Sequence, residues 1–185
     1  QVMFSLCDGM GFGAEASRES RRIVELLETL LETGFAPRSA FKLVNPVLLL
    51  AGGEQHPAAL DAGCIDLYTG ALEIFKLGAP GAFVMGQEGI QVLEGRQVPA
   101  GALEQAEPVL LSRKLWDGDR LIMVTDGVLD ALPGDDKEQV MGQFLDSLEE
   151  MPPQDMAEHV LDFALSFVPG ARDDMTVLAV QVWKK

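Results

Sequence analysis

The sequence predicts an α+β domain in which antiparallel strands are covered by helices. Two segments near each end of the chain have apolar residues at helical spacing, whereas the stretch between them has the alternation of short strands joined by close turns. Close turns favour antiparallel pairing over parallel strands with long crossovers. Helices at both ends and strands between them therefore favour a layered α+β domain.

Length and composition indicate one globular domain over residues 1–185. The hydrophobic fraction is 48% and the charged fraction is 23%, which are ordinary values for a chain with one sizeable core. The formal net charge of −15 argues against a nucleic-acid partner, because an acidic surface repels phosphate. No apolar run has the length of a membrane span, so we expect no membrane contact from this segment. Cys7 and Cys64 lie in apolar runs, as buried free thiols in a reducing compartment do.

The chain opens with a short apolar strand over residues 2–7, followed by Asp8 and a glycine-rich turn over residues 9–13. An amphipathic helix is predicted next, with Gly34 in position to end it. Its apolar face consists of Ala16, Ile23, Leu26, Leu27, Leu30 and Leu31.

Pro37 is placed to open a second helix. We expect this helix to kink or end near Asn45, because Pro46 follows and cannot donate a backbone hydrogen bond. Residues 52–57 read as a loop.

The middle of the chain predicts a meander of strands. Residues 64–68 and 72–77 flank Thr69-Gly70 as a hairpin, and further strands are expected at 82–85, 91–93, 109–112 and 120–125. Helices are then predicted around residues 140–148 and 156–167. Residues 175–183 form a nearly continuous run of β-forming residues, which is typical of a central strand.

Three acidic positions share one pattern, a carboxylate at the end of a predicted buried strand. Asp8 follows the first strand, Asp126 follows the strand that begins at Arg120, and Asp173-Asp174 precede the last strand. Carboxylates close to a core are costly unless they are paired or coordinated, and only Arg172 accompanies any of the three locally. Convergent carboxylates suit Mg²⁺ or Mn²⁺ better than zinc, which prefers His and Cys.

Gly9 and Gly127 follow two of these aspartates and would let a backbone carbonyl approach an ion closely. Each aspartate taken alone is more readily explained as a helix cap or a turn residue. The three together favour a metal site. The glycines of residues 9–13 fit neither a P-loop nor a dinucleotide fingerprint, and no serine has a histidine at a triad spacing.

The ordered motifs Cys7-Asp8-Gly9-Met10-Gly11, Thr125-Asp126-Gly127-Val128-Leu129-Asp130 and Arg172-Asp173-Asp174-Met175-Thr176-Val177 resemble those of PPM-type (2C class) metal-dependent protein serine/threonine phosphatases. Within that family the chain is most similar to the phosphatase domains of the stage II sporulation protein E group. The resemblance implies a four-layer α/β/β/α sandwich of two antiparallel sheets flanked by helices.

The resemblance also implies a catalytic centre with two divalent metal ions, Mn²⁺ or Mg²⁺. Asp8 would bridge the ions, Gly9 would supply its carbonyl, and Asp126 and Asp173 would complete the ligands. Asp130 and Asp174 would lie next to these ligands without binding the two ions directly, and Asp130 could also hold an additional ion. A water held by the ions would attack the phosphorus of a phosphoserine or phosphothreonine, without a protein nucleophile.

The implied substrate is a phosphorylated protein of sporulation or stress signalling, an anti-sigma-factor antagonist of the STAS type. We expect a cytoplasmic domain. The parent protein could be anchored in a membrane through a region upstream of Gln1. The family carries one more acidic ligand on an earlier strand, in a Gly-Asp context, so we expect the printed chain to be a phosphatase domain without its N-terminal strand or strands. This difference motivates an alternative, a catalytically impaired phosphatase fold that acts as a regulatory or binding module.

Overall fold

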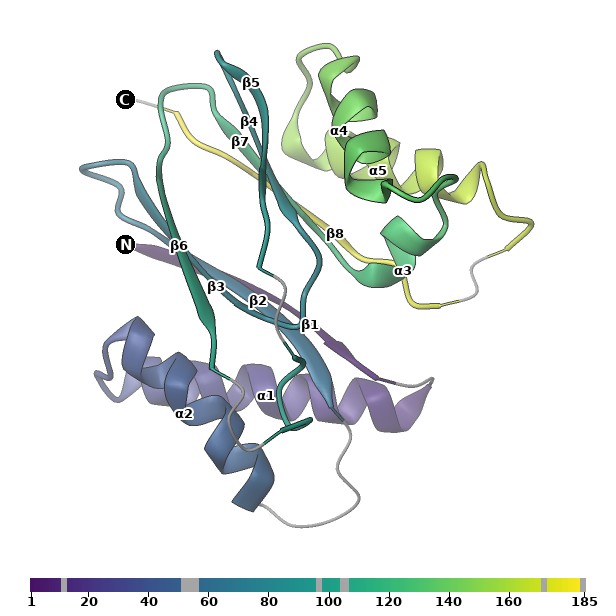
Figure 1. Ribbon diagram of the computed structural model, residues 1–185. Coiled ribbons are helices and arrows are strands. Elements are labelled where there is room, and N and C mark those ends of the chain that lie inside the picture. Colours follow the sequence, from purple (N-terminus) through teal and green to yellow (C-terminus); the bar gives the residue numbers. More distant parts are fainter. Residues whose placement is uncertain (11–12, 51–56, 96–97, 104–106, 171–172, 184–185) are drawn as a thin grey trace. The chain divides into compact units, whose positions relative to one another are not determined.

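The computed structural model describes residues 1–10, 13–50, 57–95, 98–103, 107–170 and 173–183. The chain folds as two compact units, each assembled from separate segments. Unit 1 consists of residues 1–79 and 95–113, and unit 2 consists of residues 80–94 and 114–185. Each unit contains a four-stranded sheet with helices packed on it, which confirms the α+β class with two antiparallel sheets flanked by helices (Figure 1). The expected single domain over 1–185 stays a prediction.

The sheet of unit 1 has the strand order β1-β2-β3-β6. Its strands are β1 (Val2–Gly9), β2 (Ala58–Ile65), β3 (Ala71–Leu77) and β6 (Val109–Lys114). Strand β2 is antiparallel to both β1 and β3. Helices α1 (Ala14–Glu32) and α2 (Pro37–Leu50) lie together on one face of this sheet (Figure 1). The core that they form with the sheet contains Ile23, Leu27, Ala40, Phe41, Val44, Leu60, Ala62, Phe75 and Leu77.

Helix α1 confirms the predicted amphipathic helix, and Gly34 follows it with a positive φ of 93°. The second helix does not end near Asn45, because α2 continues past Pro46 to Leu50, whereas the alternative of a kink stays a prediction. Asn45 is buried at 1% exposure, and its side chain hydrogen-bonds to the backbone of a distant segment. Its Oδ1 accepts from the Gly101 backbone N–H at 2.8 Å, and its Nδ2 donates to the Leu103 carbonyl at 3.1 Å. These tertiary contacts hold the turn of helix in which the proline removes a backbone donor.

The predicted hairpin around Thr69-Gly70 forms, but its first strand was placed too late in the sequence. Strand β2 covers residues 58–65, and Asp66 begins the turn. The Asp66 Oδ1 accepts from the backbone N–H of Tyr68 at 3.0 Å and from that of Thr69 at 2.8 Å. An aspartate that closes a turn in this way competes with strand pairing, which explains why the strand ends before it. The hydrogen bonds from Thr69 and Tyr68 lower the pKa of the Asp66 carboxyl. The predicted loop at 52–57 lies mostly outside the described residues.

The sheet of unit 2 has the strand order β5-β4-β7-β8. Its strands are β4 (Ala82–Gly86), β5 (Gly89–Leu93), β7 (Arg120–Val124) and β8 (Val177–Gln181). The helices of this unit are α3 (Asp126–Asp130), α4 (Lys137–Asp146) and α5 (Pro153–Leu165). Their core with the sheet contains Phe83, Ile122, Val124, Val128, Met141, Leu145, Met156 and Val160. Helix α3 was not predicted from the sequence.

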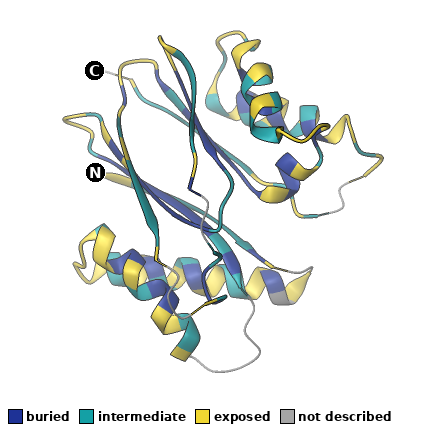
Figure 2. Ribbon diagram, viewed as in Figure 1, coloured by how far each residue is buried: buried dark blue, intermediate teal, exposed yellow. Residues whose placement is uncertain are grey.

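The prediction that the last strand is central in its sheet is wrong. Among the described residues β8 pairs with β7 alone and lies at the edge of its sheet. Its residues are half-buried, whereas the inner strands β4 and β7 are almost entirely buried (Figure 2). A run of β-forming residues therefore predicted the strand but not whether it lies at the centre or at the edge of its sheet. No described helix is both long and apolar enough to cross a bilayer.

Candidate metal centre

Asp8 and Gly9 are the last two residues of β1 in unit 1. Asp8 pairs with Ala59 and Gly9 pairs with Ala58 on β2, so the carboxylate lies at the end of a fully paired strand. Cys7, one residue earlier, packs against the core beneath α1 and α2. Because side chains alternate along a strand, Asp8 lies on the opposite face of the sheet from that core.

Gly9 has a packing role that the sequence did not reveal. A Cβ placed on Gly9 would lie 2.5 Å from the Ala16 carbonyl oxygen and 3.0 Å from the Ser20 Oγ. Only glycine therefore permits β1 to end this close to the start of α1. The role first expected for Gly9, as a carbonyl ligand, stays a prediction.

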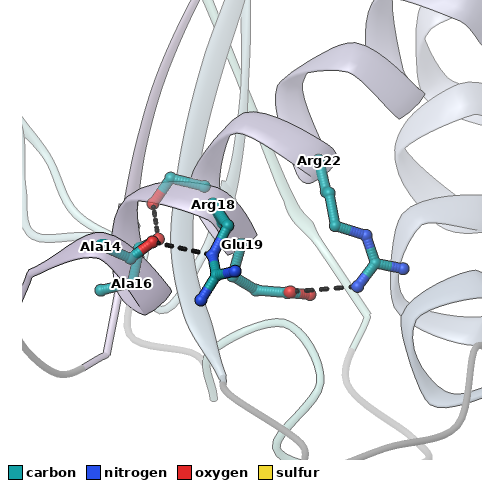
Figure 3. Close-up of polar contacts among 6 residues, drawn as sticks. Ala14, Ala16, Arg18, Glu19 and Arg22 are labelled. Atoms are coloured by element: carbon teal, nitrogen blue, oxygen red, sulfur yellow. Dashed lines mark hydrogen bonds and ion pairs between the residues drawn. The ribbon is translucent and has the colours of Figure 1, made fainter.

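The first turns of α1 are fixed by local polar contacts (Figure 3). Arg18 Nε donates to the Ala14 carbonyl at 3.1 Å, and Ser20 Oγ donates to the Ala16 carbonyl at 3.0 Å. Arg22 forms an ion pair with Glu19 at 3.3 Å. Gly13 precedes this helix with a φ of 81°, a conformation that favours glycine. Gly13 thus leads into a helix whose first turns are fixed by side-chain contacts.

In unit 2, Asp126 begins α3 immediately after β7, and Asp173-Asp174 lie just before β8. Thr125 joins the two segments. Its backbone N–H donates to the Thr176 carbonyl at 3.1 Å, and its Oγ1 accepts from the Thr176 N–H at 3.0 Å. The Thr125 Oγ1 also donates to the Asp174 carbonyl at 3.2 Å. The carboxylate-bearing ends of β7 and β8 therefore lie side by side.

Gly127 brings the same two segments into backbone contact. A Cβ on Gly127 would lie 2.5 Å from the Asp174 carbonyl oxygen and 3.2 Å from the Asp173 Cβ. The Asp-Gly motif after β7 thus allows α3 to begin directly against the Asp173-Asp174 segment. The structure brings Asp126 and Asp173 into neighbouring segments, as the metal-site prediction requires.

The two supporting aspartates differ in their surroundings. Asp130, at the end of α3, is paired with Lys137, whose Nζ lies 2.5 Å from Oδ1. The Asp174 side chain is exposed, and its backbone N–H donates to the Asp173 Oδ1 at 2.8 Å. Asp130 thus has a cationic partner within the chain, and Asp174 acts on Asp173 through its backbone. Arg172 lies outside the described residues.

The cysteine of the first motif is not a candidate ligand. Burial raises the pKa of the Cys7 thiol to about 12, partly offset by a hydrogen bond with Ser20. Cys7 also packs against the core, on the opposite face of the sheet from Asp8, so its thiol does not lie beside the candidate ligand. Cys64 is buried, and burial raises the pKa of its thiol as well.

The donor set is chemically suited to a hard divalent cation. Asp8, Asp126 and Asp173 offer carboxylate oxygens, the ligands that Mg²⁺ and Mn²⁺ prefer. Asp126 and Asp173 are brought together within unit 2, and Asp8 and Gly9 are placed in unit 1. Among the described residues, no three His, Cys, Asp or Glu side chains form a group that could hold an ion by themselves.

Residues 1–183 match the family model of stage II sporulation protein E (SpoIIE). The chain belongs to the SpoIIE family. It is 28% identical over 180 residues to stage II sporulation protein E of Bacillus subtilis strain 168, an alignment that covers 96% of this chain and 22% of that protein. The chain thus spans about a fifth of the length of this SpoIIE relative.

Solved structures agree with this assignment. The PP2C phosphatase domain of Bacillus subtilis SpoIIE, solved with a fragment of its regulatory domain, superposes with a TM-score of 0.89 at 28% identity and covers 97% of this chain and 54% of that one. The catalytic domain of the serine/threonine phosphatase PstP, in complex with two manganese ions, shares the fold with a TM-score of 0.73 at 16% identity, covering 98% of this chain and 88% of that one. The resemblance to PPM-type phosphatases is confirmed, and the SpoIIE-family chain has the PP2C-type serine/threonine phosphatase fold.

Proposed function

We propose that the chain is a metal-dependent protein serine/threonine phosphatase that hydrolyses phosphoserine and phosphothreonine. The observation that carries this proposal is the junction of β7 and β8 by Thr125, which places Asp126 beside the Asp173 segment. Carboxylates gathered at the ends of neighbouring strands offer the oxygen ligands that a hard divalent cation prefers. The SpoIIE family and the PP2C-type fold add the expectation of phosphatase chemistry.

Two divalent ions would be held by Asp8, the Gly9 carbonyl, Asp126 and Asp173. When bound, such ions supply an activated water and neutralise the charge of the phosphoryl group. The side chains contribute orientation. Thr125 fixes the β7 and β8 ends on which Asp126 and Asp173 stand, and Asp174 holds the Asp173 Oδ1 through its backbone N–H. The relation to PstP, whose structure contains two manganese ions, supports this metal count.

The proposed substrate is a phosphorylated anti-sigma-factor antagonist of the STAS type, in sporulation or stress signalling. Membership of the SpoIIE family supports the sporulation context. We further propose a cytoplasmic location for this domain, with any membrane anchor of its parent protein upstream of Gln1.

A second candidate function is a catalytically impaired phosphatase fold that binds a partner without hydrolysis. It is favoured by the finding that no three carboxylates among the described residues form a ready metal site. Titration with Mn²⁺ separates the two functions, because the phosphatase requires binding of two ions and the binding module does not.

The decisive experiment is Mn²⁺-dependent release of phosphate from a phosphoserine peptide by the wild-type chain and the Asp126→Asn variant. We expect activity in the wild type and its loss in the variant. Asp146→Asn is the matched control, because Asp146 is an exposed carboxylate at the end of α4. Equal rates in the wild type and Asp126→Asn would refute the site, and a wild-type chain without activity or Mn²⁺ binding would favour the second function.

A further inference from the structure

Unit 1 contains a buried ion pair that the proposed reaction does not use. Asp61 on β2 and Lys76 on β3 are directly opposite each other in the antiparallel ladder. Their exposed fractions are 1% and 0%, and the Lys76 Nζ donates to the Asp61 Oδ2. Two charges removed from water in this way cost several kcal/mol each, and a pair of apolar residues is often equally stable or more so. The pair therefore calls for an explanation other than stability.

One oxygen of this pair remains available. Among the described residues the Asp61 Oδ1 has no hydrogen-bond partner, although it is buried. A buried acceptor without a partner is rare and costly, so it marks a place where an ordered water or an ion is expected. Burial raises the pKa of Asp61 to about 6 in spite of the Lys76 ammonium, which lowers it.

The register of the sheet places this oxygen near Asp8. Leu60 and Ala62 point into the core beneath α1 and α2, so Asp61 between them lies on the opposite face, the same face as Asp8. Leu6 pairs with Asp61, and Asp8 pairs with Ala59. Asp8 and Asp61 are therefore diagonal neighbours on adjacent strands, a relation in which residues are about 7–8 Å apart.

Gly95 holds the cationic partner in place. A Cβ on Gly95 would lie 2.8 Å from the Lys76 Cδ and 3.1 Å from its Cβ, so the lysine stem lies directly against this glycine. Asp8, Asp61 and Lys76 are consequently neighbours on the adjacent strands β1, β2 and β3. Asp8 is the proposed bridging ligand, and Asp61 and Lys76 are held in place by their ion pair and by packing of Lys76 against Gly95.

We propose that Asp61 is a positioning residue for cation binding at Asp8. Its Oδ1 accepts a hydrogen bond from an ordered water in the hydration of the ion, while Lys76 holds the Oδ2 and fixes the direction of the carboxylate. Groups that orient ligands and waters around a metal typically contribute about 10- to 100-fold in affinity. This inference rests on the proposed metal centre and adds residues to it that the sequence motifs do not contain.

The test is Mn²⁺ binding by calorimetry to the wild-type chain and to the double variant Asp61→Leu/Lys76→Met. Apolar replacement of both charges should preserve the fold, so the melting temperature without metal should equal or exceed that of the wild type. We expect Mn²⁺ affinity to fall about 10- to 100-fold. Unchanged affinity in a folded double variant would overturn the inference.

Asp61→Asn is the second variant, because its amide oxygen must face the Lys76 ammonium, and its NH2 group, which cannot accept a hydrogen bond, then takes the place of Oδ1. It should also bind Mn²⁺ more weakly, and it decides the question if the double variant does not fold. Ile65→Val is the matched control. Ile65 is buried on the same strand and face but farther from Asp8, so this change should lower the melting temperature slightly without altering Mn²⁺ affinity.

Asp8→Asn separates failure of the inference from failure of the proposed function. If the wild type binds Mn²⁺, Asp8→Asn abolishes binding and both Asp61 variants bind normally, only the inference on Asp61 is wrong. If the wild type does not bind Mn²⁺, or Asp8→Asn binds as well as the wild type, the metal centre at Asp8 is wrong and the inference is rejected with it.

Discussion

Thr125 and Asp174 are joined by a hydrogen bond of 3.2 Å from the threonine hydroxyl to the aspartate carbonyl, across 49 residues of sequence. The same hydroxyl accepts from the Thr176 N–H. One side chain thus fixes the end of β7 to the approach of β8, and with them the two acidic segments of unit 2.

Thr125→Val keeps the shape of the side chain and removes both hydrogen bonds. Because Thr125 is buried at 4% exposure, the backbone groups of Asp174 and Thr176 lose a partner. We expect the free energy of unfolding to fall by about 1–3 kcal/mol, measured by urea denaturation. Thr125→Ser retains the hydroxyl, so its free energy of unfolding should fall by clearly less than that of Thr125→Val. Equal losses in the two variants would show that packing of the methyl group, and not the hydroxyl, holds the junction.

Gly127→Ala should damage the same region by steric conflict. The added Cβ would lie 2.5 Å from the Asp174 carbonyl oxygen, so α3 or the segment before β8 must move. We expect a lower melting temperature and weaker Mn²⁺ binding. Gly142→Ala is the control. Gly142 lies within α4, and a Cβ on it would have its nearest neighbour, the Ile90 side chain, at 3.9 Å. That change should be neutral or should stabilise the helix by up to about 1 kcal/mol. A tolerated Gly127→Ala with normal Mn²⁺ binding would contradict the close approach.

Asp61 should give stability a distinct dependence on pH. Because burial raises the pKa of its carboxyl from 3.8 to about 6, the folded chain keeps a proton that the unfolded chain releases in this window. The contribution of Asp61 to stability therefore falls as the pH rises from 3.8 to about 6, by about 1.4 kcal/mol per pH unit, and is constant above it.

This dependence is measured as the difference in unfolding free energy between the wild type and Asp61→Asn, in urea without metal. The unfolding free energy of the wild type relative to that of Asp61→Asn should fall as the pH rises from 3.8 to about 6. A difference that grows with pH would mean that Lys76 outweighs burial and keeps Asp61 ionised.

Cys7 should be unreactive in the folded chain. With its pKa raised to about 12 by burial, the thiol contains very little thiolate at about pH 8, where an ordinary cysteine reacts readily. Alkylation followed by mass spectrometry should show slow labelling of Cys7 in buffer and rapid labelling in urea. Rapid labelling of Cys7 without denaturant would show that the end of β1 opens from the core.

Features set by local chemistry could be predicted from the sequence. The apolar period of α1, the glycine after it and the hairpin around Thr69-Gly70 each follow from neighbouring residues, and all are confirmed. The alternative in which α2 ends near Asn45 was wrong, because distant backbone groups of Gly101 and Leu103 hold Asn45 within the helix. The rank of β8 was wrong because strand order depends on partners elsewhere in the chain.

The candidate site divides in the same way. The three acidic motifs could be found because each stands next to a glycine or a strand end in the sequence. Thr125 was visible in its motif, but its bonds to Asp174 and Thr176 depend on β7 lying beside β8. Asp61 and Lys76 interrupt two apolar strands of one hairpin, a signal that would have suggested a cross-strand pair once the register was known.

The interleaved segments of the two units have a consequence for synthesis on the ribosome. The hairpin of β4 and β5 belongs to unit 2 but is inserted between the two segments of unit 1, residues 1–79 and 95–113. Its neighbour β7 is translated only after unit 1 is complete, and β8 follows after a further 52 residues (124 to 177). The nascent chain must therefore carry an unpaired β4 edge until Arg120–Val124 leaves the exit tunnel. Ribosome-bound chains that stop short of β7 are the ones in which aggregation or chaperone binding should be greatest.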